Sequence, residues 1–116
     1  MGFASPAADG RLPEIQDEQT LDAVLGAERA VLYKHSTRCI VSTWSIREVR
    51  AFSEAHPDWP VYVLKVIEER RLSDAVAERL GIRHQSPQAF VIRDGRCVWD
   101  ASHSDISADA LSRQTA

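Results

Sequence analysis

Cysteine is scarce in this chain, which has only two in 116 residues, Cys39 and Cys97. Two cysteines so far apart cannot form the dense disulfide framework that supports small secreted domains. Together with four scattered histidines they match no known spacing of zinc ligands, so we expect no metal site. A cysteine in this chain is therefore a candidate for chemistry rather than for covalent cross-linking.

Long hydrophobic runs are also missing from the sequence. No apolar stretch approaches the ~20 residues of a membrane-spanning helix, so we expect no membrane partner. The first residues lack the basic region and apolar core of a secretory signal, and Pro6 stands where a myristoylation signal needs Ser or Thr. We therefore expect a cytoplasmic location, where a reactive thiol stays reduced.

The chain carries no large excess of charge of either sign. Its formal net charge is −3, which is poorly suited to phosphate neutralisation, so no nucleic-acid partner is expected. With 44% hydrophobic and 27% charged residues, a chain of this length suits a single globular domain. We assign residues 1–17, which begin with a stretch rich in Ala, Gly, Pro and Ser, to a flexible arm and residues 18–116 to the domain.

The periodicity of the apolar residues predicts alternating helices and strands. A first helix should begin near Thr20, as its cap, and end at Gly26. The nearly continuous apolar run at 61–67, rich in β-branched residues, is typical of a central strand covered on both faces. Asp94-Gly95 is a strong hairpin signal. The other predicted elements are a strand at 31–35, helices at 40–56 and 73–80, hairpin strands at 89–92 and 96–99, and a last helix capped by Ser104 or Ser107, with Gly81 ending the helix at 73–80.

The resulting order of elements is α-β-α-β-α-β-β-α. Helices after the first two strands imply right-handed crossovers and parallel neighbours, and the final hairpin adds antiparallel strands. This order resembles the thioredoxin-like class, an α/β fold with a central mixed four-stranded sheet flanked by helices. Thioredoxin-like folds carry a cis-proline opposite the active cysteine, and Ser86-Pro87 occupies that place here. We expect the Ser86 backbone to face Cys39 and to be available to pair with an extended strand of a substrate protein, called the client below.

The most reactive position is expected at Cys39, where the strand at 31–35 gives way to a helix. The free N–H groups and dipole of a helix start lower the pKa of a cysteine from ~8.5, often to about 3.5–7.5. We expect the positive charges of Arg38 and Lys34 to add to this effect. Ser42 stands where a Cys-x-x-Cys pair has its second sulfur, which indicates a one-thiol site. The polar residues at 36–38 and 42–43 disfavour the alternative, a buried structural cysteine.

Three segments resemble the monothiol bacilliredoxins, thioredoxin-like proteins of the bacillithiol system. Residues 34–42, Lys-His-Ser-Thr-Arg-Cys-Ile-Val-Ser, are similar to the family's Lys-His-Ser-Thr-x-Cys-Pro-Ile-Ser. Residues 84–88, His-Gln-Ser-Pro-Gln, resemble its His-Glu-Ser-Pro-Gln, and residues 99–106 resemble its Trp-x-x-Ser-His ending. Two departures stand out. Ile40 replaces a proline and restores a backbone N–H near the sulfur, and Gln85 replaces a glutamate and so removes a negative charge.

The resemblance implies a thiol–disulfide oxidoreductase that removes bacillithiol from mixed disulfides of client proteins. Cys39 would be the nucleophile, with Ser42 beside it and bacillithiol as co-substrate, and no metal or organic cofactor would be required. A bacillithiol disulfide reductase or another thiol partner would regenerate the protein. Arginines at 38, 47 and 83 are candidates to bind the malyl carboxylates of bacillithiol. The implied substrate-binding residues are Thr37, Arg38, Ile40, His84, Ser86, Pro87 and His103.

Two other functions stay open on the sequence alone. A monothiol-glutaredoxin-like module would hold an iron–sulfur cluster at Cys39, although such proteins use Cys-Gly-Phe-Ser and Ile40-Val41 departs from that motif. A cysteine hydrolase would need an oxyanion hole and an orienting third residue, and the sequence indicates neither.

The remaining cysteine and the tryptophans are interpreted as structural. Cys97 follows the Asp94-Gly95 turn, so it should lie at the pole of the sheet opposite to Cys39 and take no part in the reaction. Trp44, Trp59 and Trp99 are expected to pack in the core or at its edge rather than to bind a ligand.

Overall fold

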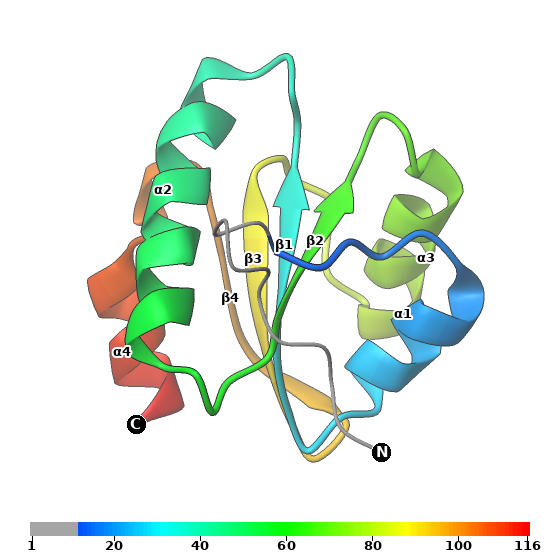
Figure 1. Ribbon diagram of the computed structural model, residues 1–116. Coiled ribbons are helices and arrows are strands. Elements are labelled where there is room, and N and C mark those ends of the chain that lie inside the picture. The colour runs from blue at the N-terminus through cyan, green and yellow to red at the C-terminus, as the bar shows by residue number, and fades with distance from the viewer. Residues whose placement is uncertain (1–11) are drawn as a thin grey trace.

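The computed structural model describes residues 12–116 and consists of a four-stranded sheet between two layers of helices (Figure 1). Helices α1 and α3 cover one face of the sheet, and α2 and α4 cover the other (Figure 1). In chain order the elements are α1 (Glu18–Leu25), β1 (Arg29–His35), α2 (Ile40–Ala55), β2 (Val61–Lys65), α3 (Arg70–Leu80), β3 (Gln88–Arg93), β4 (Arg96–Ser102), a 3₁₀ turn η1 (His103–Asp105) and α4 (Ala108–Thr115).

The sheet has the mixed topology that the sequence predicts. Its strand order is β2-β1-β3-β4, with β1 parallel to β2 and antiparallel to β3, and β3 antiparallel to β4. The thioredoxin-like α/β class is therefore confirmed. Because β1 and β2 run in the same direction, both end at the pole of the sheet where the loop to α2 begins (Figure 1).

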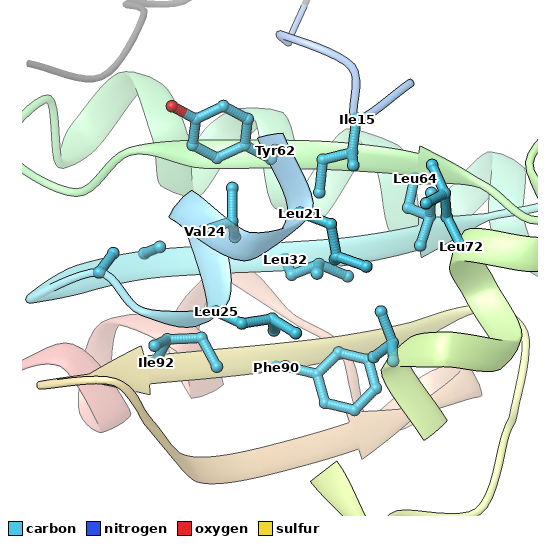
Figure 2. Close-up of a cluster of buried hydrophobic side chains, with 13 residues drawn as sticks. Ile15, Leu21, Val24, Leu25, Leu32, Tyr62, Leu64, Leu72, Phe90 and Ile92 are labelled. Carbon is cyan, nitrogen blue, oxygen red and sulfur yellow. The ribbon is translucent and has the colours of Figure 1, made fainter. Parts of the chain in front are cut away.

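Alternation along β1 sends successive side chains to the two faces of the sheet. Ala30 and Leu32 join the cluster under α1 and α3, which Figure 2 shows, whereas Val31 and Tyr33 pack under α2 and α4. A fully buried aliphatic side chain contributes roughly 1.5–3 kcal/mol to folding, so these two clusters hold the central strand firmly in place. The strand thus provides a rigid base for the loop that follows it.

The apolar strand at 61–67 is not central, as its sequence suggested, but is the outer strand β2. It is also shorter than predicted, because the backbone N–H of Glu69 bonds to the carbonyl of Lys65 and turns the chain away (2.8 Å). The apolar run is explained by helices on both faces and by residues 13–15 along its outer edge. Ile15 N–H donates to the carbonyl of Val63, and Val63 N–H donates to that of Pro13 (2.8 and 2.9 Å).

These contacts also revise the start of the domain. The sequence assigned residues 12–17 to a flexible arm, yet Leu12 and Ile15 are buried and Glu14 forms a bridge with Val63 of β2. Residues 12–17 therefore belong to the folded domain. Residues 1–11 of the expected arm lie outside the described residues.

Helix caps account for two further differences at the ends of elements. Asp17, not Thr20, caps α1, and its carboxylate accepts a hydrogen bond from the Thr20 N–H (2.7 Å). This hydrogen bond is the main reason that the pKa of Asp17 is lowered. At the other end of the chain Ser107, one of the two predicted caps, accepts from the Ala110 N–H and begins α4 (3.0 Å).

Two turns adopt the left-handed backbone that their residues suggest. Asp94 and Gly95 have φ angles of 51° and 75°, as a two-residue hairpin turn requires, and Gly81 ends α3 with φ of 66°. The hairpin turn lies at the opposite end of the sheet from the β1–α2 loop (Figure 1). No helix within residues 12–116 has both the length and the apolar character to cross a bilayer.

The end of α3 yields a prediction about stability. A Cβ added at Gly81 would meet no atom within 4 Å, so Gly81→Ala should be costly only because of its backbone angle. We expect a loss of about 1 kcal/mol. Gly81→Asn should cost less, because asparagine adopts this conformation more readily. Urea unfolding of both variants is the measurement, and equal stabilities for alanine and glycine at this position would contradict the assignment.

Candidate active site

The loop between β1 and α2 presents Cys39 at the first turn of a helix, as predicted. A tight turn leads to it, in which the Cys39 N–H donates to the Ser36 carbonyl (3.3 Å) and the Arg38 N–H donates to the Ser36 hydroxyl (3.4 Å). Cys39 itself has extended backbone angles and is the N-cap residue of α2. Its partly exposed sulfur is therefore adjacent to backbone N–H groups that have no partner within the helix.

These N–H groups favour the thiolate. The pKa of Cys39 is lowered, chiefly by the backbone N–H of Ser42, with smaller contributions from the Val41 N–H and the Ser42 hydroxyl. Desolvation opposes the shift without cancelling it. Neither Arg38 nor Lys34 is among the groups that shift this pKa, so the expected help from their charges is not found. The extra N–H of Ile40 does not contribute to it either.

Ser42 is fixed in place by contacts on both sides. It is fully buried, and its hydroxyl oxygen accepts a hydrogen bond from the Ser36 N–H (3.2 Å). Its carbonyl accepts one from the Tyr33 hydroxyl (3.3 Å). The serine that replaces a second cysteine thus ties the start of α2 to the loop and to β1.

Tyr33 is a component of the site that the sequence pattern missed. Burial raises the pKa of its hydroxyl to about 12, so it remains a hydrogen-bond donor at physiological pH. The same oxygen lies 3.4 Å from Nδ1 of His35. In the sequence Tyr33 stands within an apolar strand, which does not distinguish it from a core residue. It could have been identified from the rule that the hydroxyl of a buried tyrosine usually has a hydrogen-bond partner.

Lys34 lies on the face of the sheet opposite to Tyr33, the face covered by α1 and α3, and is fully buried. Its Nζ donates to the carbonyl of Ser73 in α3 (3.0 Å) and lies 3.0 Å from Nδ1 of His84. It also lies 5.8 Å from the centroid of the Phe90 ring. Burial lowers the pKa of this amine to about 8, and both burial and Lys34 lower the pKa of His84. Lys34 therefore acts on His84 and not on the thiol.

The second segment of the site precedes β3. The Ser86–Pro87 peptide bond is cis, as predicted. Gln88 pairs with Lys34, so Pro87 lies at the same end of β1 from which the chain continues to Cys39. The His103 N–H donates to the carbonyl of Pro87 (3.1 Å), which brings the end of β4 to this pole. Of the predicted site residues, Ser86, Pro87 and His103 are therefore neighbours, with His84 two residues before Ser86.

The surface around the thiol is apolar on the side of α2. Ile40 is 79% exposed and Trp44 is 64% exposed. Val41, in the same first turn as Ile40, is a further exposed apolar side chain. The prediction that Trp44 packs in the core or at its edge is therefore wrong. Its ring instead lies 5.3 Å from the guanidinium of Arg47, on the outer face of α2. Thr37 and Arg38 are exposed in the loop beside this apolar surface.

Cys97 lies far from Cys39, as the hairpin predicts. It pairs with Ile92, which pairs with Ala30 near the start of β1, and five residues of β1 span about 16 Å. Its thiol donates to the carbonyl of Trp99 (3.4 Å), and burial raises its pKa. A disulfide needs Cα atoms within roughly 7 Å, so Cys39 and Cys97 cannot form one in this fold.

The contrast between the two cysteines gives a direct prediction. Alkylation of Cys39 by iodoacetamide should titrate with a midpoint below the ~8.5 of a free thiol, because the Ser42 N–H stabilises the thiolate. Cys97 should react far more slowly at neutral pH and serves as the internal control. Peptide mass spectrometry across a pH series reports both rates, and a Cys39 midpoint at or above that of a free thiol would refute the assignment.

The buried Lys34 amine should make stability depend on pH. Its pKa is about 8 in the fold and about 10.4 in an unfolded chain, so the unfolded chain binds more protons between these values. The contribution of Lys34 to stability should therefore rise as the pH increases through this window. Lys34→Met should lack this rise. Urea unfolding of both proteins across the window tests this, and parallel pH profiles would contradict it.

Comparison with known proteins agrees with this geometry. A protein described as a proposed oxidoreductase with a thioredoxin fold superposes with a TM-score of 0.86 and 28% identity, over 93% of this chain and 96% of that one. A mutant thioredoxin from Halobacterium salinarum gives a TM-score of 0.72 at 23% identity, over 97% and 92% of the two chains. Thioredoxin from Trypanosoma brucei brucei gives 0.75 at 9%, over 99% and 93%. These likenesses establish the thioredoxin fold.

The family follows from a match along most of the sequence. Residues 12–111 match the family described as monothiol bacilliredoxin BrxC. The match includes Cys39, the Ser86–Pro87 bond and His103. The chain is a thiol oxidoreductase of thioredoxin fold, and it belongs to the monothiol bacilliredoxin family.

Proposed function

We propose that this protein removes bacillithiol from protein mixed disulfides by a monothiol mechanism, with Cys39 as the nucleophile. The observation that carries the proposal is the site at the start of α2. There a partly exposed thiol of lowered pKa has a serine, not a second cysteine, one turn further along. The other cysteine lies at the far pole of the sheet. Membership of the bacilliredoxin family supports bacillithiol as the co-substrate.

The proposed first step is a thiol–disulfide exchange without net oxidation. The Cys39 thiolate attacks the bacillithiol sulfur of the mixed disulfide, and a new S–S bond forms between these two atoms. The original S–S bond breaks, and the client cysteine leaves as a thiolate that takes a proton from solvent. Because Ser42 has no sulfur, the adduct on Cys39 persists until an outside thiol attacks it.

In the second step a free bacillithiol thiolate attacks the sulfur that is bound to Cys39. Bacillithiol disulfide leaves, and the Cys39 thiolate is restored. The reducing equivalent that frees the client thiol therefore comes from the incoming free bacillithiol, which leaves as a disulfide with the bacillithiol that was removed from the client. A bacillithiol disulfide reductase, or another thiol partner, is then needed to return that disulfide to the thiol form.

The surroundings of the thiol suit a protein client. The exposed apolar side chains of Ile40 and Trp44 provide a contact surface beside the sulfur. We propose that the backbone of Ser86 pairs with an extended client segment, as sheet edges and turn segments do in peptide recognition. Thr37, Arg38, His84 and His103 are proposed to contact the part of bacillithiol that lies nearest the sulfur.

The proposal is tested by following the bacillithiol group. Purified protein is mixed with a bacillithiol-capped client, and intact masses of both proteins are recorded over time. The bacillithiol mass should move from the client to Cys39, and it should stay there until free bacillithiol is added. Cys39→Ser should abolish the transfer, whereas Cys97→Ala should leave its rate unchanged. Transfer that survives Cys39→Ser would overturn the mechanism.

A second variant tests the role of position 42. In Ser42→Cys the new thiol stands one helical turn from the adduct and within disulfide range. It should attack Cys39, release bacillithiol and leave an internal disulfide, which intact mass and thiol counting detect. Persistence of the adduct in this variant would contradict the inference that the side chains at positions 39 and 42 lie within disulfide range.

The same preparations address the iron–sulfur alternative. A protein purified without oxygen should be colourless and should lack a cluster band in its absorption spectrum. A coloured preparation whose band disappears in Cys39→Ser would favour the cluster-binding function instead.

A further inference from the structure

A pocket of about 630 Å³ opens beside the thiol loop, between α2, the end of β2 and residues 12–16. It lies on the β2 side of β1, whereas Pro87 precedes β3 on the other side, so it is separate from the cis-proline surface. Its volume is in the range of small-molecule sites. The pocket is lined by Leu12, Pro13, Glu14, Gln16, His35, Thr37, Ile46, Arg50, Val63 and Lys65.

The lining combines an apolar part with positive charge. Ile46 and Val63 contribute apolar surface, and Lys65 and Arg50 contribute two cations. Lys65 is paired with Glu14 (3.4 Å), but within residues 12–116 no carboxylate lies within ion-pair distance of Arg50. Among the described residues of the lining, Arg50 is thus the cation without a carboxylate partner, and it is exposed.

The charge of Arg50 reaches His35 and Tyr33 in β1, the strand that leads into the thiol loop. The pKa of His35 is lowered first by burial and then by Lys65 and Arg50, against a smaller opposite effect of Glu68. Arg50 also favours the ionised form of Tyr33. Lys65 and Arg50 therefore both act as cations on His35, which lines the pocket two residues before Thr37.

The pocket is also within reach of a group attached to Cys39. Thr37 lines it and stands two residues before Cys39, so their Cα atoms are at most about 7.6 Å apart. A small molecule joined to Cys39 by a disulfide can extend from the sulfur past Thr37 into this space. A folded client protein is too large to enter it, which favours the low-molecular-weight part of the mixed disulfide.

We infer that this pocket receives the carboxylate-bearing end of the bacillithiol joined to Cys39, with Arg50 as its main cationic contact. The inference rests on the proposed function and names the residue that would select this thiol over uncharged ones. Arginine suits the role because its planar guanidinium pairs with carboxylates through two parallel hydrogen bonds. None of the arginines at 38, 47 and 83 that the sequence suggested lines the pocket.

The test compares two caps on the same client, bacillithiol and the uncharged thiol 2-mercaptoethanol. Arg50→Gln should lower the rate constant for transfer of bacillithiol to Cys39 about tenfold, or about 1.4 kcal/mol, and should leave transfer of 2-mercaptoethanol unchanged. Arg50→Lys should recover part of the loss. Arg96→Gln is the matched control, because Arg96 is exposed beside the hairpin turn at the far pole and makes the same change of charge.

The outcomes separate the inference from the proposed function. Wild-type protein that accepts 2-mercaptoethanol but never bacillithiol would overturn both. Wild-type protein that accepts bacillithiol, with Arg50→Gln slowed equally for both caps or for neither, would overturn only the assignment of the pocket. Equal losses in Arg50→Gln and Arg96→Gln would show a general effect of net charge and would also refute it.

Discussion

The contact between the Ser42 backbone N–H and the Cys39 sulfur is the interaction on which the rest of the site depends. It requires a rigid helix start, and that start is held by two hydrogen bonds, one part-buried and one buried. The Ser42 hydroxyl accepts from Ser36, and the Ser42 carbonyl accepts from Tyr33 of the central strand. The hydroxyl of the buried Tyr33 therefore links the hydrophobic core to Ser42, the residue whose N–H stabilises the thiolate. The partly exposed Cys39 is thus held beside two fully buried residues, Ser42 and Tyr33.

The alternation of β1 separates two polar systems that lie next to each other in sequence. Tyr33 faces α2 and supports the thiol, whereas Lys34 faces α3 and contacts His84 before the cis-proline. The start of α2 and the segment before the cis-proline are thus connected to adjacent residues of β1. A buried amine costs free energy through desolvation, and hydrogen bonds to Ser73 and His84 offset part of that cost. Tyr33 and Lys34 are therefore adjacent in sequence but act on different groups, Ser42 and His84.

Local signals were enough to predict the order of elements, the Asp94-Gly95 hairpin, the Gly81 stop and Cys39 at a helix start, since each depends on a few neighbouring residues. The outer position of β2 was not predictable, because a strand covered on both faces has the same apolar pattern at the centre or the edge. Arg50 was missed for a related reason. Its distance to the thiol loop depends on how α2 packs beside β2, which no short motif encodes.

The central claim is that the thiolate stabilised at the start of α2 is the group that takes bacillithiol from the client. The most direct measurement is the pH dependence of the single-turnover rate constant for that transfer, set beside the alkylation midpoint of Cys39 in the same buffers. The two midpoints should coincide and should lie below that of a free thiol. A transfer rate that keeps rising through the pKa of an ordinary cysteine, or a midpoint unrelated to Cys39 alkylation, would contradict this mechanism.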